Sequence, residues 1–274
     1  MPTQVNHELG HVQKTLLLPL WGRAVETKKR RPLLVDATAA RIVEQLPLDF
    51  APIAAKMDPL SQLAWVKRSV IGDQVITRFL ARHPAGAIVN IGCGLDTTFD
   101  RVDNGQVRWY DLDLPDVIAL RRRFIPETAR RTLIAASFLD EGWLHTIDVT
   151  DNVLFLAAGV FYYFQAEVVK AFVLRLLAAY PGGELLFDVS SPIGVRVANK
   201  RVIADAGLDE RSALVWGLAN KRDLLAWDPR LHLLGTHYYF RSLRIGLRNL
   251  VMGTLSDFLG IQYMIHLRLG QHTT

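Results

Sequence analysis

The stretch "AIVNIGCGLDTTFDRV", residues Ala87–Val102, decides the fold. It opens as a buried strand, turns at Gly92 and Gly94, and continues into an Asp-Thr-Thr that is typical of a helix start. Because glycine has no Cβ, backbone atoms at such a turn can approach a ligand that a side chain would repel. The order of strand, Gly-x-Gly turn and helix predicts the first unit of an α/β sheet with a ligand at the turn.

The rest of the chain continues this alternation of strands and helices. A helical pattern over Pro59–Pro84 precedes the turn. Strands are expected at Val107–Asp113, Thr132–Phe138, Asn152–Gly159 and Glu184–Ser190, with helices at Pro115–Phe124 and Ala166–Tyr180. These strands are continuous apolar runs, as in a parallel sheet buried on both faces. The sequence therefore predicts a doubly wound, mostly parallel α/β sheet.

The C-terminal third departs from this simple repeat. A polar, helical insertion is expected over Ser191–Arg230. It is followed by a predicted strand at Leu231–Phe240, a helix at Arg241–Gly260 and a last strand at Ile261–Gly270.

Composition narrows the class of protein. The chain has 274 residues, of which 50% are hydrophobic and 22% charged, as in a well-cored globular protein. Its net charge is +5, with basic clusters at Lys28–Arg31, Arg121–Arg123 and Arg130-Arg131. No nucleic-acid-binding motif accompanies them, so we interpret these clusters as solvated helix faces and expect no nucleic-acid partner. An acidic small substrate is compatible with the charge.

Membrane and secretory signals are weak. The longest apolar or aromatic run, Val153–Phe164, is about half of the roughly 20 residues that a membrane helix needs. The apolar run Thr15–Trp21 is too short for a signal sequence and lacks a small-residue cleavage site. The single cysteine, Cys93, has no internal disulfide partner. We expect a cytoplasmic protein without a membrane partner and without a metal site.

The spacing after the turn indicates a nucleoside cofactor. Asp113 ends the second predicted strand, about 20 residues after Gly92, where an acid can accept hydrogen bonds from a ribose diol. The third glycine of a dinucleotide fingerprint is replaced by Thr97, and neither a Tyr-x-x-x-Lys pair nor a Walker loop is present. S-adenosylmethionine has a ribose but no pyrophosphate, and the turn favours it over a nicotinamide cofactor.

Four segments carry a resemblance to a known family: "VNIGCGLDTTFDR", "WYDLDLPDVIALRR", "VLFLAAGVFYYF" and "LLFDVSSP". They resemble the leucine carboxyl methyltransferase family, and within it the bacterial polyketide-type, tetracenomycin-like O-methyltransferase branch. The resemblance runs from about Val25 to the C-terminus. It implies a seven-stranded Rossmann-like methyltransferase core over residues 85–274, with a substrate-cover insertion at 191–230. Residues 1–84 would form a helical cover that contributes to the cofactor and substrate pocket.

The resemblance also implies roles for individual residues. Arg68 would pair with the carboxylate of the cofactor, Asp113 would hold its ribose, and Asp140 would meet its adenine. The implied cofactor-binding set is Arg68, Gly92, Gly94, Asp113, Leu114, Asp140 and Ala158, with Gly159 lining the pocket beside the methyl donor. Lys28 and Lys29 are candidates for an N-terminal lysine that touches the cofactor in some members.

Two positions depart from the family pattern. Ala158 stands where protein-methylating members have a glutamate, and Thr98 stands where an arginine is common. Both departures argue against a protein substrate and leave cofactor binding intact.

Several residues also have a purely structural interpretation. Asp96 is expected to cap the following helix through the Thr98 or Phe99 amide. Cys93 is expected to be an inert small core residue. Arg68 has a structural alternative, an ion pair with Asp73 one turn further on, although a role at the cofactor is favoured.

No general base is unmistakable in the sequence. Tyr162, Tyr163, His232 and His237 are candidates, but the tyrosines also read as core residues and the histidines as polar residues at a strand edge. The lack of a clear base slightly favours an acidic methyl acceptor.

These observations predict an S-adenosyl-L-methionine-dependent O-methyltransferase that releases S-adenosyl-L-homocysteine. The expected acceptor is a small carboxylate or hydroxyl compound of the polyketide or secondary-metabolite type. The alternatives are a non-catalytic S-adenosylmethionine-binding or sensing protein and a protein carboxyl methyltransferase. The sequence specifies neither the acceptor nor the oligomeric state.

Overall fold

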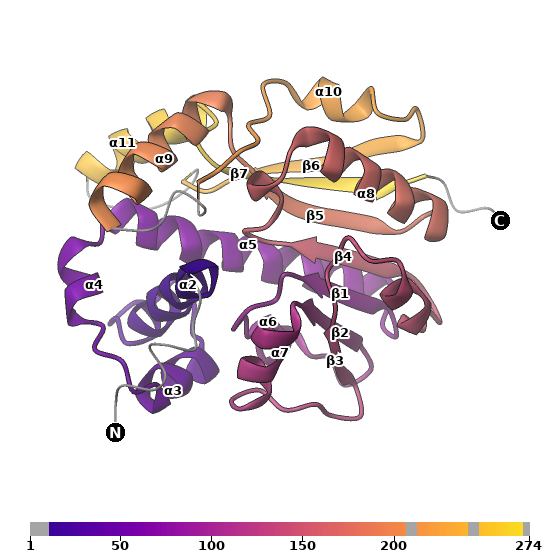
Figure 1. Cartoon of the computed structure of the whole chain (residues 1–274), viewed down its shortest axis with the longest axis horizontal. Helices are drawn as coiled ribbons and strands as arrows, with labels where there is room; N and C mark the ends of the chain where they lie inside the picture. Colours follow the sequence, from indigo (N-terminus) through magenta and orange to yellow (C-terminus); the bar gives the residue numbers. More distant parts are fainter. Residues whose placement is uncertain (1–10, 207–212, 241–246, 271–274) are drawn as a thin grey trace.

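A single seven-stranded sheet organises the chain (Figure 1). The computed structural model describes residues 11–206, 213–240 and 247–270. The strand order is β3-β2-β1-β4-β5-β7-β6, in which β1 to β5 are parallel and β7 runs antiparallel to both of its neighbours. The strands are β1 (Ala87–Ile91), β2 (Arg108–Asp113), β3 (Arg131–Ala135), β4 (Val153–Ala157), β5 (Glu184–Val189), β6 (Leu231–Tyr238) and β7 (Tyr263–Leu269). The predicted doubly wound, mostly parallel seven-stranded sheet is confirmed.

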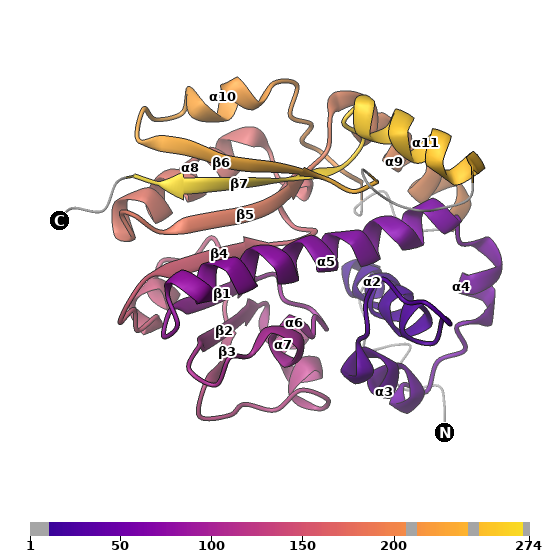
Figure 2. The same cartoon turned by 180° about the vertical axis from the view of Figure 1, so that it is seen from behind.

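Helices cover both faces of this sheet. The helices in the described part of the chain are α2 (His11–Thr27), α3 (Ala37–Gln45), α4 (Ala51–Lys56), α5 (Pro59–Arg82), α6 (Thr98–Val102), α7 (Pro115–Arg122), α8 (Ala166–Ala179), α9 (Pro192–Ala206), α10 (Lys221–Leu225) and α11 (Leu247–Phe258), with 3-10 turns η1 (Gly142–Thr146) and η2 (Phe161–Tyr163). Helix α8 lies in front of the sheet in Figure 1, and α5 crosses the opposite face in Figure 2.

Adjacent residues in the central strands face opposite helices. Ile88 of β1 packs in the cluster that contains Val75 and Phe79 of α5, whereas Val89 packs in the cluster that contains Phe172 of α8. Every residue of β1, β4 and β5 is buried. Burial on both faces explains why these strands are unbroken apolar runs in the sequence.

The strands end where the local backbone forces a turn. The strand predicted to reach Gly159 stops at Ala157, since Gly159 has a φ of +85°. The strand predicted to reach Phe138 stops at Ala135, and a turn follows in which Asp140 accepts a hydrogen bond from the Ser137 amide (3.1 Å). Residues 207–212 of the predicted insertion and 241–246 of the predicted last helix lie outside the described residues.

The basic clusters were interpreted as solvated helix faces, and for two arginines this is wrong. Arg121 is 1% exposed and Arg131 is 5% exposed. Arg121 binds Asp111, and Arg131 binds Asp100 and the Pro126 carbonyl. A buried guanidinium needs such partners, so these side chains are structural.

The helices α2 and α3 pack beside the sheet at the carboxyl ends of its strands. Leu17 and Leu20 of α2 and Ile42 of α3 form a small core with Leu95 and Ile125.

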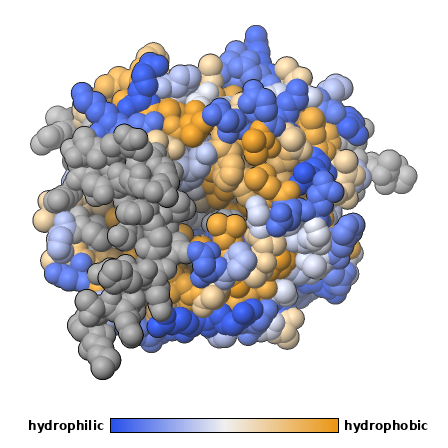
Figure 3. Space-filling model, viewed as in Figure 1, coloured by the Kyte–Doolittle hydropathy of each residue, from blue (hydrophilic) through white to orange (hydrophobic). Residues whose placement is uncertain are grey.

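On the face drawn in Figure 3, hydrophobic residues gather toward the middle and hydrophilic residues lie mostly toward the border. Among the described helices, none has the length and apolar character needed to cross a bilayer.

Candidate active site

A cavity of about 210 Å³ lies at the carboxyl ends of β1 and β4, beneath α2 and α5. Ligands bind at this edge in doubly wound sheets. The cavity brings together several residues singled out from the sequence, namely Arg68, Gly92, Cys93, Gly94, Asp96, Ala158, Gly159, Tyr162 and Tyr163. Residues of α2 that the sequence did not single out, Leu16, Leu18, Pro19 and Arg23, complete one wall.

The glycine turn requires its glycines. Gly92 has a φ of +62° and Gly94 a φ of +47°, a conformation that L-residues with side chains rarely adopt. A Cβ on Gly92 would lie 2.5 Å from Val160 Cγ2, and one on Gly94 would lie 3.3 Å from Leu16 Cδ2. Bare backbone therefore faces the cavity.

Asp113 is tied to this turn. Its Oδ2 accepts a hydrogen bond from the Gly94 amide (2.8 Å), and its Oδ1 accepts one from the Leu114 amide (2.8 Å). Burial raises the pKa of the Asp113 carboxyl, and these two hydrogen bonds oppose the rise. Asp113 does not line the cavity itself but stands at the side of the glycine turn.

A buried arginine holds the turn in place. The Arg121 guanidinium donates to the carbonyl oxygens of Gly94 (2.9 Å) and Asp96 (2.7 Å), and it forms an ion pair with Asp111 (2.6 Å). The Asn90 amide donates to both Asp111 and Asp96. This tether is not apparent from the sequence, because Arg121 stands within three consecutive arginines.

A second buried carboxylate joins the N-terminal helices to the turn. Asp36 Oδ2 accepts hydrogen bonds from Arg23 Nε (2.9 Å), Arg101 Nη1 (2.7 Å) and Thr97 Oγ1 (2.5 Å). Arg23 also donates to the Leu95 carbonyl (3.0 Å). Thr97 stands where a dinucleotide fingerprint has its third glycine. Through its bond to Asp36, it connects the turn to the helices α2 and α3.

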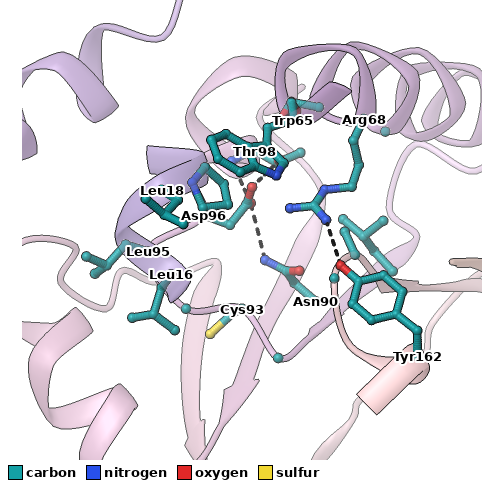
Figure 4. A pocket seen from close by; sticks show the side chains of 18 of the residues that line it. Leu16, Leu18, Trp65, Arg68, Asn90, Cys93, Leu95, Asp96, Thr98 and Tyr162 are labelled. Atoms are coloured by element: carbon teal, nitrogen blue, oxygen red, sulfur yellow. Dashed lines mark hydrogen bonds between the residues drawn. The ribbon is translucent and has the colours of Figure 1, made fainter. Parts of the chain in front are cut away.

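Arg68 extends from α5 into the cavity. Its Nη1 lies 3.0 Å from Asp188 Oδ2 and 3.4 Å from the Tyr162 hydroxyl, toward which it points in Figure 4. Asp188 is fully buried and also accepts a hydrogen bond from the Gly159 amide (2.7 Å). The structural alternative, an ion pair of Arg68 with Asp73, is wrong, because Asp73 instead binds Arg101 through both of its oxygens (2.8 and 2.9 Å).

The structural expectations for the turn residues agree with the structure. Asp96 accepts a hydrogen bond from the Thr98 amide (2.9 Å). Cys93 is 3% exposed, and burial raises the pKa of its thiol well above the usual value. A thiol that stays protonated is a poor nucleophile.

The remaining predicted residues lie away from the cavity. Leu114 and Asp140 are exposed, at the ends of the neighbouring strands β2 and β3. His232 and His237 are on the edge strand β6, where the His237 ring lies 6.4 Å from that of His266. Lys28 pairs with Glu44 (2.9 Å) and Lys29 with Glu26 (2.6 Å); neither lysine lines the cavity.

The residues present fit a nucleoside sulfonium cofactor. A Cβ on Gly159 would lie 2.9 Å from Arg68 Nη1, so the glycine leaves room for the guanidinium to reach the cavity. Among the described residues, only Nη1 of that guanidinium has hydrogen-bond partners, which leaves Nε and Nη2 for a carboxylate. Leu114, next to Asp113, is 47% exposed and offers an apolar side chain to an adenine ring.

Comparison with known proteins agrees with this geometry. Residues 17–176 match the family described as leucine carboxyl methyltransferase. The chain belongs to the leucine carboxyl methyltransferase family. It is therefore an S-adenosylmethionine-dependent methyltransferase, and the recognition made from its sequence is confirmed.

This methyltransferase is similar in sequence to two named methyltransferases. It is 32% identical, over 224 residues and 81% of both chains, to the tetracenomycin polyketide synthesis O-methyltransferase TcmP of Streptomyces glaucescens. It is 28% identical, over 209 residues and 70% of both chains, to the S-adenosyl-L-methionine-dependent methyltransferase dpfgK of Gibberella zeae.

Solved structures share the fold. A putative methyltransferase from Thermobifida fusca superimposes with a TM-score of 0.59 at 17% identity, covering 90% of this chain and 93% of the other. A DUF574 family protein from Streptomyces avermitilis superimposes with a TM-score of 0.58 at 14% identity, covering 90% and 96%. At these identities the likeness concerns the fold alone.

Proposed function

We propose that this methyltransferase transfers a methyl group to an acidic oxygen of a small acceptor. The acceptor is a carboxylate, or a hydroxyl that ionises readily, of the polyketide or another secondary-metabolite type. The polyketide setting is supported by the likeness to TcmP over 81% of both chains.

The proposal rests on the protonation states of the titratable side chains that line the cavity. Burial raises the pKa of Tyr162 well above its usual value and that of Tyr163 to about 12, so both hydroxyls stay protonated at neutral pH. Arg23 and Arg101 hold the pKa of Asp96 below its usual value in spite of its burial. Among the described residues that line the cavity, none is a base suited to neutral pH, which supports an acceptor oxygen that arrives already ionised.

The cofactor supplies a methyl group already activated on a sulfonium, so the protein's main task is alignment. Arg68 would bind the amino-acid carboxylate, and the backbone at Gly92 and Gly94 would lie against the adjoining atoms. Asp113 would accept hydrogen bonds from the ribose, with Leu114 and Asp140 near the adenine. Holding two reactants in line is worth about 7–11 kcal/mol at best.

The open cavity favours catalysis over a binding role alone. Residues that the cofactor assignment does not use, among them Asn199 and Gln262, also line the cavity, which supports an acceptor site beside the cofactor. Trp65 and Leu156 give the cavity apolar walls.

Calorimetry with S-adenosylhomocysteine tests the cofactor half of the proposal. We expect binding by the wild type and a loss of about tenfold to a hundredfold in affinity in Asp113→Asn, which keeps the shape but loses the charge. Asp223→Asn, at an exposed position on α10, is the control. Absence of binding by the wild type would refute the proposed function.

The pH dependence of turnover tests the acceptor half. With a carboxylic acid acceptor, the release of S-adenosylhomocysteine should be flat between about pH 6 and 9, because the carboxylate is fully ionised there. With a phenol, the rate should rise with pH up to the pKa of the phenol itself. If the rate changed with an inflection near pH 7 for both acceptors, a base of the protein would be involved, and this result would contradict the proposal.

A further inference from the structure

Five residues that the cofactor assignment does not use also line the cavity, namely Tyr163, Ala198, Asn199, Leu214 and Gln262. We call these five residues the distal wall. They come from η2, from α9 and the segment after it, and from the residue immediately before β7. Arg68, Gly92 and Gly94, the residues suited to the cofactor, line the same cavity.

The distal wall has no charged side chain. An anion placed against uncharged groups and away from water pays a large desolvation cost. We therefore expect the ionised oxygen of an acceptor to lie away from this wall. Whatever part of the acceptor meets the distal wall is neutral.

The polar groups of the distal wall differ in their availability. The Asn199 side chain is committed, because its amide nitrogen donates to the Leu214 carbonyl (2.9 Å) and its oxygen accepts from the Leu214 amide (2.7 Å). Neither the Gln262 amide nor the Tyr163 hydroxyl has a hydrogen-bond partner within the described part of the chain. Burial keeps the Tyr163 hydroxyl protonated, with a pKa of about 12, so it is a hydrogen-bond donor.

The backbone on both sides of Gln262 is fixed. The Ser190 hydroxyl donates to the Ile261 carbonyl, and the Ser191 amide donates to the Gly260 carbonyl (2.9 Å). On the other side, Tyr263 pairs with Val189 in the sheet. A side chain on so constrained a backbone loses little backbone entropy when it binds a ligand.

We propose that Gln262 and Tyr163 bind a neutral carbonyl or hydroxyl group at the far end of the acceptor and so set its orientation. The glutamine amide offers both a donor and an acceptor, and the tyrosine hydroxyl offers a donor. Rotating the acceptor end for end would place its anion against the uncharged wall. This inference rests on the proposed function and narrows the acceptor to an acid whose opposite end bears a neutral oxygen.

Selectivity between two probe acids tests the inference. Binding of para-hydroxybenzoate and of benzoate is measured by calorimetry on protein saturated with S-adenosylhomocysteine. The two acids differ only in the neutral hydroxyl. We expect the wild type to bind para-hydroxybenzoate about tenfold more tightly, the effect of two neutral hydrogen bonds. Gln262→Met and Tyr163→Phe should each reduce the preference to about threefold, and the double variant to less than about twofold.

The control is Gln74→Met, at an exposed position on α5 that does not line the cavity. It should keep the tenfold preference, and all variants should keep the wild-type affinity for S-adenosylhomocysteine and the wild-type melting temperature. If Gln262→Met does not fold, Tyr163→Phe still tests the inference, because this change removes only one hydroxyl.

The outcomes separate this inference from the proposed function. If S-adenosylhomocysteine does not bind to the wild type, the proposed function fails. If it binds and the wild type has no preference, binds neither acid, or keeps its preference in the double variant, only the role of Gln262 and Tyr163 is overturned.

Discussion

Arg68 and Asp188 lie 120 positions apart in the sequence, yet Nη1 of the arginine is 3.0 Å from Oδ2 of the aspartate. The pair connects α5 to the end of β5 at the cavity. Asp188 also holds the Gly159 amide, so one carboxylate fixes both the guanidinium and the backbone beside it. The position of Arg68 therefore depends on a residue that itself lies outside the cavity lining.

Asp188→Asn should damage stability and cofactor binding together. The change keeps the volume but leaves a buried guanidinium without its counter-charge, which typically costs about 3–5 kcal/mol. Denaturant unfolding measures this loss, and calorimetry with S-adenosylhomocysteine should give an affinity at least about tenfold lower. The exposed Asp223→Asn should change neither quantity. An Asp188→Asn protein as stable as the wild type would show that the pair contributes little.

Gly159→Ala tests whether space beside Arg68 matters apart from backbone strain. Alanine at positive φ costs about 1–2 kcal/mol by itself. Gly105 is a matched control, since its φ of +81° is close to the +85° of Gly159 and a Cβ there meets nothing within 4 Å. We expect both variants to lose stability, but only Gly159→Ala to lose affinity for S-adenosylhomocysteine, because its Cβ would displace the guanidinium. Equal affinities in the two variants would contradict this account.

The sequence was informative where the cause of structure is local. The strand expected at the start of Ala87–Val102 is β1 (Ala87–Ile91), and the helix predicted over Pro59–Pro84 ends at Arg82. Burial on both faces leaves a continuous apolar signature, and Asp96 accepts a hydrogen bond from the amide of Thr98, the first residue of α6. Such features depend on neighbours along the chain, which periodicity records.

The sequence was uninformative where partners are distant. Nothing near Asp36 shows that it will meet Thr97 and Arg101, and nothing near Arg68 indicates Asp188 rather than Asp73. The insertion of β7 between β5 and β6 is likewise a choice of pairing that apolar runs do not encode. Gln262 has no sequence signal, because a lone glutamine at the start of a predicted strand is usually an exposed polar residue.

Arg121→Met should loosen the glycine turn. The guanidinium joins the carbonyl oxygens of Gly94 and Asp96 to Asp111, and its removal leaves the fully buried Asp111 without its ion-pair partner. We expect a loss of about 3–5 kcal/mol in the free energy of unfolding and weaker binding of S-adenosylhomocysteine. The neighbouring Arg122→Met is a close control, since the Arg122 side chain is 56% exposed. A large effect of Arg122→Met, or none of Arg121→Met, would refute the tether.

His237 should make the protein less stable in mild acid. Burial lowers the pKa of this histidine, and His266 and Arg78 lower it further. Its Nε2 is buried without a hydrogen-bond partner in the described part of the chain. In the unfolded chain this histidine has the ordinary pKa of about 6.5. Below that pH the imidazole is therefore protonated in the unfolded chain but still neutral in the folded protein. The free energy of unfolding therefore falls as the pH drops through about 6.5, until the folded-state pKa is reached.

His237→Gln removes this titration. We expect its stability, relative to the wild type, to rise as the pH is lowered from about 7.5 to 5.5, as measured by urea unfolding at each pH. His232→Gln, at an exposed position on the same strand, should follow the wild type over the whole range. Because His237 lies outside the cavity, the affinity for S-adenosylhomocysteine at neutral pH should be unchanged in both variants. A His237→Gln curve parallel to the wild type would mean that the imidazole finds a partner when it is protonated.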